Sequence, residues 1–102
     1  MPKNIVMYES RICGFCMAAK RLLKQKGWEY EARIVDGNRE LRSQMQELTG
    51  RTSVPQIYFG DTHVGGYDDL AALENNGELD DLYNAWFAQV LLSESKLWRL
   101  IY

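Results

Sequence analysis

The chain has 102 residues, of which 46% are hydrophobic and 25% charged, a composition typical of one globular domain with a modest core. The net charge of −2 and the lack of a basic stripe with interleaved aromatic residues argue against a nucleic-acid-binding protein. No apolar run approaches the roughly 18 residues of a membrane span, and no secretory h-region follows Met1. We therefore expect a cytoplasmic protein in a reducing compartment.

The first predicted elements are a buried strand over residues 4–8 and an amphipathic helix. The strand is a run of β-branched and large side chains. Apolar residues then recur at helical spacing from Cys16, and Gly27 ends the pattern. Cys13 therefore lies between the strand and the helix N-terminus, where unpaired N–H groups and the helix dipole favour a thiolate over the free thiol of pKa about 8.5.

Cys13 and Cys16 are the chain's two cysteines and form a Cys-x-x-Cys motif. A closed structural zinc site needs four Cys or His ligands, and His63 is the one further candidate. A structural disulfide across so short a loop contributes only about 2 kcal/mol, and two inert core thiols are the remaining alternative. At a strand-to-helix junction of a chain expected in the cytosol, the motif indicates thiol redox chemistry.

The remaining elements follow from apolar periodicity and turn residues. In chain order they are a strand over 30–35, a helix from Asn38 to Thr49-Gly50, strands over 56–59 and 62–64, a short helix over 68–75, and a helix from Leu79. The second helix presents Leu41, Met45 and Leu48 on one face. The order β-α-β-α-β-β-α predicts an α/β fold of the thioredoxin-like type, with a mixed four-stranded sheet flanked by helices.

Two further motifs precede and follow the predicted hairpin. Val54-Pro55 precedes the third predicted strand. Its peptide bond is either trans, as for a proline at a strand entry, or cis, which costs about 0.5–1 kcal/mol before proline. The sequence alone slightly favours the trans form. Gly65-Gly66 allows close backbone approach, and Asp68 and Asp69 suit a first helical turn, where they cap a helix or bind an ammonium group.

The Cys-Gly-Phe-Cys motif, the run Arg51–Gln56 and the run Gly65–Asp69 stand in the order and spacing of a glutaredoxin, and residues 4–83 resemble the small bacterial dithiol members. The resemblance implies a glutathione-dependent oxidoreductase of protein disulfides and glutathione mixed disulfides, with Cys13 as nucleophile and Cys16 as resolving thiol. It also implies a cis Val54–Pro55 bond. The glutathione site that it implies contains Val54, Pro55, Gly66, Asp68 and Asp69. We expect Ser53 beside them and, from their positive charge, Arg11 and Arg51 to belong to the same site.

Within that implied site, Asp69 takes the ammonium group of the γ-glutamyl unit, and Arg51 and Arg11 are candidates for the glycyl carboxylate. Most dithiol members have Pro-Tyr between the cysteines, whereas this chain has Gly14-Phe15, which is typical of the monothiol branch. The alternative is therefore a dimer that binds a [2Fe–2S] cluster through one Cys13 thiolate from each copy and two glutathiones.

Residues 84–102 extend beyond the expected domain of residues 1–83. They contain ten large apolar side chains among nineteen residues, too many to leave in water. We expect residues 84–92 to continue the last helix, and residues 96–102 to form a second apolar segment that covers an exposed face or a second copy. The alternatives are a helix folded back on the same core, a homodimer and a partner surface.

Overall fold

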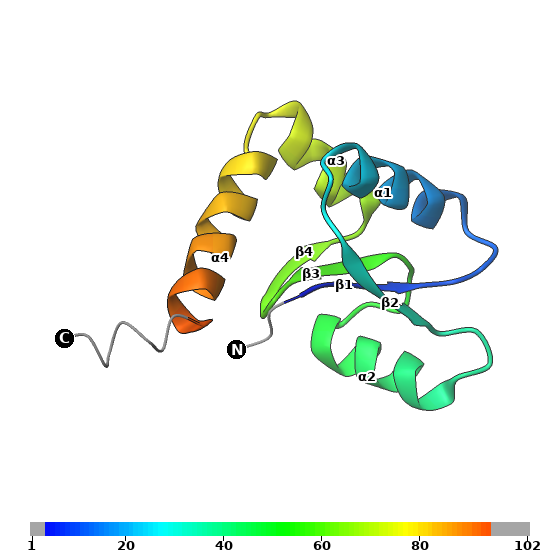
Figure 1. The fold of residues 1–102 in the computed structure, drawn as a ribbon. Coiled ribbons are helices and arrows are strands. Elements are labelled where there is room, and N and C mark those ends of the chain that lie inside the picture. The colour runs from blue at the N-terminus through cyan, green and yellow to red at the C-terminus, as the bar shows by residue number, and fades with distance from the viewer. Residues whose placement is uncertain (1–3, 95–102) are drawn as a thin grey trace.

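The computed structural model describes residues 4–94. Its elements confirm the predicted order (Figure 1). They are β1 (Ile5–Glu9), α1 (Gly14–Gln25), β2 (Tyr30–Ile34), α2 (Arg39–Thr49), β3 (Gln56–Phe59), β4 (Thr62–Gly65), α3 (Tyr67–Asn75) and α4 (Leu79–Glu94). The first strand is shifted from the expected residues 4–8, and Glu9 therefore belongs to the sheet.

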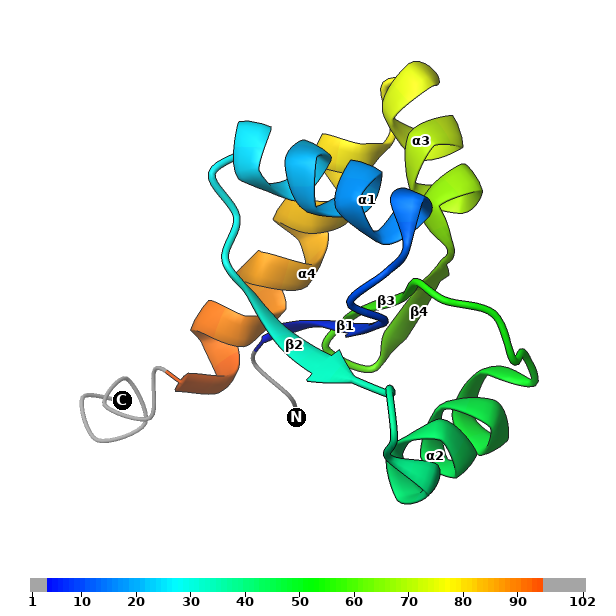
Figure 2. The ribbon, with the colours of Figure 1, turned by 90° about the vertical axis from the view of Figure 1, so that its right-hand side faces the viewer.

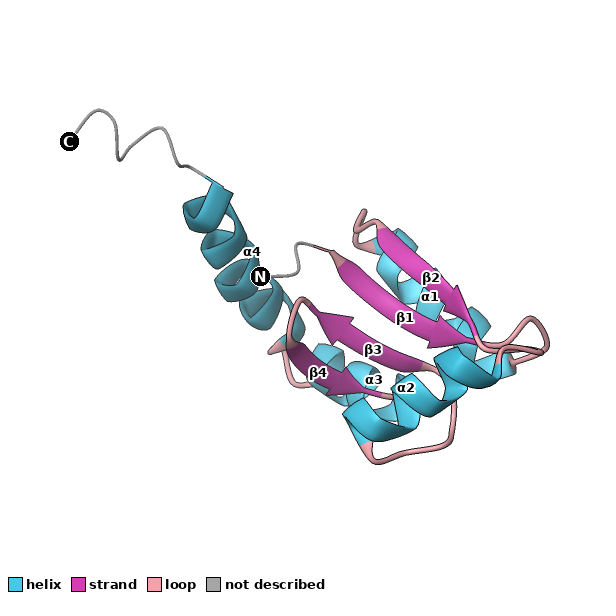
Figure 3. Ribbon diagram, turned by 90° about the horizontal axis from the view of Figure 1, so that it is seen from below, coloured by secondary structure: helices cyan, strands magenta, loops and turns pink. Residues whose placement is uncertain are grey.

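The four strands lie in the order β2-β1-β3-β4 (Figure 3). β1 is parallel to β2 and antiparallel to β3, and β3 is antiparallel to β4, which confirms the mixed thioredoxin-like sheet. Because β3 runs against β1, Gln56 at its start pairs with Tyr8 near the end of β1. This register brings the Val54-Pro55 turn beside the loop that carries Cys13.

Helices cover both faces of the sheet, with α1 and α3 on one side and α2 on the other (Figures 1 and 2). Side chains of β1 alternate between these two layers, as a strand requires. Ile5 and Met7 belong to the cluster that includes residues of α1, α3 and α4, whereas Val6 and Tyr8 pack toward α2. By the same alternation, Glu9 faces α1.

The ends of α2 follow from its caps. The Asn38 side chain accepts a hydrogen bond from the Leu41 N–H at 3.0 Å, and Gly50 takes the left-handed conformation, with φ of 70°, that ends the helix. Met45 is buried, whereas Leu48, from the same predicted apolar set, is 58% exposed. Leu48 instead borders an open pocket beside Tyr58, because no described element covers its outer side.

Helix α4 continues through residues 84–92 as predicted. Trp86 and Val90 are buried in the cluster that also contains Phe59, whereas Phe87, the next residue after Trp86, is 41% exposed. The expected apolar segment 96–102 lies outside the described residues. No helix in the described range is both long and apolar enough to cross a bilayer.

Candidate active site

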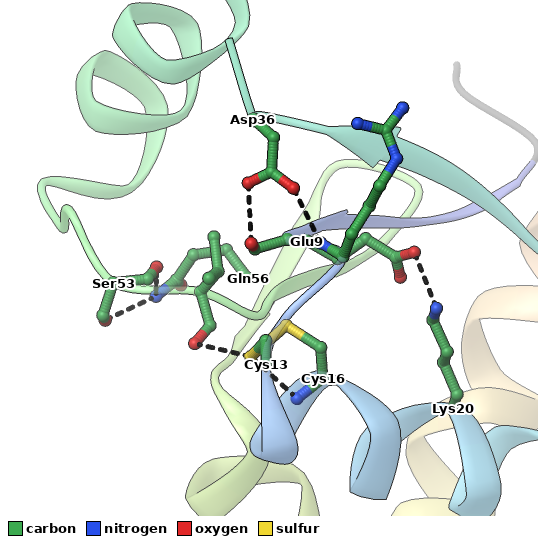
Figure 4. Close-up of a disulfide and its surroundings, with 10 residues drawn as sticks. Glu9, Cys13, Cys16, Lys20, Asp36, Ser53 and Gln56 are labelled. Atoms are coloured by element: carbon green, nitrogen blue, oxygen red, sulfur yellow. Dashed lines mark hydrogen bonds and ion pairs between the residues drawn. A yellow bond between two sulfur atoms is a disulfide. The ribbon is translucent and has the colours of Figure 1, made fainter. Parts of the chain in front are cut away.

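Cys13 occupies the N-cap position of α1 with an extended backbone. The backbone N–H of Cys16 donates a hydrogen bond to the Sγ atom of Cys13 at 3.1 Å. The Cys13 sulfur is therefore the acceptor for one of the N–H groups that the first helical turn leaves unpaired. The two cysteines form a disulfide with Cα atoms 5.2 Å apart (Figure 4). Cys16 is 1% exposed and Cys13 is half-buried, so solvent and substrates reach Cys13 more easily.

The loop before β3 carries a cis Val54–Pro55 bond, which confirms the expectation drawn from the resemblance. The carbonyl oxygen of Val54 lies 3.8 Å from Cys13 Sγ. The buried side chain of Gln56 holds this loop, since its Nε2 donates to the Ser53 carbonyl at 3.1 Å. The Oε1 of Gln56 lies 2.7 Å from Nε2 of His63 on β4, which ties the loop to the hairpin.

The glycine pair allows the backbone to approach the Asp69 carboxylate. Gly65 has φ of 117°, and a Cβ at this position would collide with the Asp69 side chain, so only glycine fits. Oδ2 of Asp69 accepts hydrogen bonds from the Gly66 N–H and from Nη1 of Arg51, each at 2.9 Å. The Arg51 guanidinium, and then the Gly66 N–H, hold the pKa of the Asp69 carboxyl below its usual value.

A groove of about 240 Å³ joins these features. It contains seven of the eight residues proposed from the sequence for ligand binding: Arg51, Ser53, Val54, Pro55, Gly66, Asp68 and Asp69. Phe15, Gln56 and Tyr67 also line it, and sequence reasoning missed them. Phe15 is 62% exposed and stacks on Tyr67 with ring centroids 6.2 Å apart. The position of Phe15 between the two cysteines was the signal in the sequence that could have identified it as a site residue.

Arg11 is not among the residues that line this groove. Its backbone N–H donates to Oδ2 of Asp36 at 2.8 Å, and the Ser10 hydroxyl donates to Oδ1 at 2.6 Å (Figure 4). These two bonds, with that of Ser10 the stronger influence, lower the pKa of Asp36. These bonds connect the loop before Cys13 to the segment that follows β2, and Arg11 is exposed.

The glutaredoxin family model matches residues 5–64, more than half of the chain. The chain belongs to the glutaredoxin family. It is 47% identical over 81 residues to a glutaredoxin of Pseudomonas aeruginosa, a match that covers 79% of this chain and 96% of the relative. Glutaredoxin 3 of Escherichia coli K12 is 43% identical over 79 residues, which cover 78% of this chain and 95% of the relative.

Solved glutaredoxin structures share the fold. The solution structure of a Brucella melitensis glutaredoxin has a TM-score of 0.70 and 44% identity, with 80% of this chain and 89% of that chain covered. The holo form of glutaredoxin C1 from Populus tremula × tremuloides has a TM-score of 0.75 and 28% identity, with 83% and 79% covered. Membership of this family makes thiol–disulfide oxidoreduction the general activity of the chain.

Proposed function

We propose that this glutaredoxin is a glutathione-dependent thiol–disulfide oxidoreductase that reduces protein disulfides and glutathione mixed disulfides. One observation carries the proposal: Cys13 Sγ receives a helix N-terminal N–H at 3.1 Å and lies 3.8 Å from Val54, whose backbone borders the groove. A position that favours a thiolate once Cys13 is reduced is therefore adjacent to the groove.

In the proposed complex, the backbone beside Val54-Pro55 pairs with the cysteinyl unit of glutathione, which directs its sulfur toward Cys13. Asp69 binds the γ-glutamyl ammonium group, since its carboxylate is charged, 45% exposed in its side chain and fixed by two donors. Gly66 and Asp68 contribute backbone contacts, and Arg51 and Ser53 border the same groove. Arg11 stays a prediction for the glycyl carboxylate.

The proposed reaction consists of thiol–disulfide exchanges. The Cys13 thiolate attacks the glutathionyl sulfur of a mixed disulfide, and the substrate leaves as a thiolate that takes a proton from water. A second glutathione thiolate then attacks the Cys13-bound glutathione, which releases glutathione disulfide and the Cys13 thiolate. With a protein disulfide, the Cys13 thiolate attacks one of the two sulfurs and forms a mixed disulfide with the substrate. Cys16 then loses its proton and attacks Cys13 Sγ, so that the Cys13–Cys16 disulfide forms while the bond between Cys13 and the substrate breaks, and the reduced protein leaves.

Two serine variants test this assignment. Cys13→Ser should abolish turnover of a glutathionylated substrate, because no nucleophile remains at the helix N-cap. Cys16→Ser should keep much of that turnover, because glutathione itself resolves the Cys13–glutathione disulfide. Normal turnover by Cys13→Ser would overturn the proposal.

Cluster binding stays a prediction. Within residues 4–94, no group of three or more His, Cys, Asp or Glu side chains is placed to hold a metal ion. As the resemblance to the monothiol branch implies, a [2Fe–2S] cluster would take thiolates from two copies of Cys13 and from two glutathiones. Anaerobic reconstitution with iron, sulfide and glutathione tests this alternative, since a bound cluster gives visible absorbance and a dimer.

A further inference from the structure

Glu9 is a buried carboxylate that the proposed reaction does not use. It is the last residue of β1, is 2% exposed, and faces α1 by the alternation that directs Ile5 and Met7 the same way. Its Oε1 pairs with Nζ of Lys20 at 2.9 Å. Its Oε2 is buried and has no hydrogen-bond partner among the described residues. Such an atom is costly to bury, so its presence calls for a reason.

The ion pair lies next to the resolving cysteine. Lys20 follows Cys16 by four residues on α1, so the two side chains are neighbours on one face of the helix. Figure 4 shows Glu9 reaching from the strand to Lys20, on the side of α1 that carries Cys16. Cys16 is almost fully buried, which strengthens the effect of any nearby charge on its thiol.

The other polar groups around Glu9 do not replace this pairing. Tyr30 on β2 is the further titratable neighbour, and its pKa is raised first by burial and then by the charge of Glu9. The pKa of Lys20 is raised, first by the hydrogen bond that its ammonium group donates to Glu9. Asp36, which follows β2, is bonded instead to Ser10 and to the backbone of Arg11.

We propose that Glu9 is a positioning residue that keeps Cys16 in its thiol form by offsetting the positive charge of Lys20. Without Glu9, the Lys20 ammonium would attract a Cys16 thiolate across one helical turn. With Glu9 in place, Cys13 is the thiolate and Cys16 stays protonated. The pair would then set how fast Cys16 competes with free glutathione for the Cys13–glutathione disulfide, a role that rests on the proposed function.

The competing step is balanced in atoms and electrons. Cys16 loses its proton to solvent and attacks Cys13 Sγ. The Cys13–Cys16 bond forms while the bond between Cys13 and glutathione breaks, and glutathione leaves as a thiolate that is then protonated. Because a thiolate attacks and a thiol does not, the rate depends on the ionised fraction of Cys16.

The test uses the charge-neutral variants Glu9→Gln and Lys20→Gln, the double variant, and Glu47→Gln on the exposed face of α2 as the matched control. The pKa of Cys16 is measured in a Cys13→Ser background from the pH dependence of alkylation. Glu9→Gln should lower it by about one unit. Lys20→Gln should raise it by about as much, because the cation that favours a Cys16 thiolate is then removed while the Glu9 carboxyl group stays.

In the protein with both cysteines, reduced enzyme is mixed with glutathione disulfide, quenched with acid and followed by mass spectrometry. Tenfold more thiolate, offset by its weaker nucleophilicity, should speed conversion of the Cys13–glutathione disulfide about threefold in Glu9→Gln. Lys20→Gln should slow it by a similar factor. The conversion rate of the double variant should lie near that of the parent protein. The rate of Glu47→Gln should equal that of the parent protein.

Opposite shifts distinguish an electrostatic role from a structural one, because both single variants break the same ion pair. Shifts of the same sign, or none, would overturn the proposal. If Glu9→Gln does not fold, Lys20→Gln decides alone, since the Lys20 side chain is 40% exposed and its variant should fold. Failure of the proposed function is separate: no Cys13–glutathione disulfide would form, while the pKa series would still report on Glu9.

Discussion

The guanidinium of Arg51 lies 2.9 Å from the carboxylate of Asp69, and both residues line the groove beside the active-site disulfide. The Gly66 N–H donates to the same carboxylate oxygen. The Asp69 side chain is still 45% exposed, so the carboxylate is oriented before a ligand arrives and remains open to a cation. Preorganisation of this kind lowers the entropy cost of binding.

Replacing Asp69 by Asn should weaken glutathione binding without slowing the chemical step. The variant keeps the size of the side chain but loses the charge that attracts the γ-glutamyl ammonium group. A charge-assisted hydrogen bond contributes about 1.5–3 kcal/mol, so the KM for glutathione should rise about tenfold or more. Steady-state kinetics with a glutathionylated peptide should show nearly unchanged kcat, the signature of lost uniform binding.

Asp68→Asn is the matched control for this experiment. It removes the same charge from the neighbouring residue, whose side chain is exposed. Its KM should change by less than about threefold, because a solvated charge near the groove contributes only weak long-range attraction. Equal effects of the two variants would assign the Asp69 result to general electrostatics, and an unchanged KM for Asp69→Asn would place the ammonium contact elsewhere.

The Arg51–Asp69 pair should also appear in the acid stability of the protein. The folded-state pKa of Asp69 is lowered, first by Arg51 and then by Gly66. Its contribution is therefore complete above the unfolded pKa of about 3.9 and is lost as pH falls through the lower folded pKa. Since both side chains are about half exposed, the contribution should stay below about 1 kcal/mol.

Urea unfolding across the acid range measures this contribution. The parent protein should lose stability relative to Asp69→Asn as pH is lowered from about 5 to 2. The two proteins should differ most above that window, where the carboxylate of the parent is fully charged. Parallel stability curves for the two proteins would show that the ion pair contributes nothing measurable.

Cys13 should have a thiol pKa below the free value of about 8.5. The cause is its N-cap position, where the backbone N–H of residue 16 points at Sγ and the helix dipole adds to it. That N–H is retained in Cys16→Ser, so ultraviolet thiolate absorbance of this variant titrates Cys13 alone. A value at or above the free one would contradict the role of the helix N-terminus.

Local patterns predicted most of the fold. The strand β2, the Asn38 cap of α2 and the glycine at position 50 each depend on a few neighbouring residues, and all appear in the structure. The burial along β2 does not alternate as its sequence does, because Ala32 is exposed beside Glu31. Most of the groove-lining residues from 51 to 69 could also be predicted, because their motifs match a family in order and spacing, whereas Gln56 and Tyr67 were not identified. The cis bond before Pro55 came from that resemblance alone, since the residues by themselves slightly favoured trans.

Side-chain pairs between distant segments could not be predicted in this way. The Arg51–Asp69 ion pair and the Phe15–Tyr67 stack depend on how α1, α3 and the loop before β3 meet. Glu9 was outside the predicted strand, because a charged residue ends an apolar run in sequence. The pairing of Glu9 with Lys20 depends on the packing of β1 against α1, which local sequence patterns do not show.

The last prediction concerns α4, which Figure 1 shows at the opposite end of the sheet from the loop between β1 and α1. Trp86 is 6% exposed, and its ring contacts those of Phe59 and Tyr83. Trp86→Ala should cost about 3–5 kcal/mol of unfolding free energy, because it leaves a large cavity in the core. Phe87→Ala, at the exposed neighbouring position, should cost clearly less.

Trp86→Phe separates packing from polarity. The indole Nε1 of Trp86 is buried without a hydrogen-bond partner among the described residues, so removing it relieves a desolvation cost that partly offsets the lost volume. Its loss of stability should therefore fall well below that of Trp86→Ala in urea unfolding. Turnover per folded molecule should stay unchanged in all three variants, because the lining of the groove ends at Asp69. A folded Trp86→Ala protein with lost turnover would show that α4 supports the active site directly.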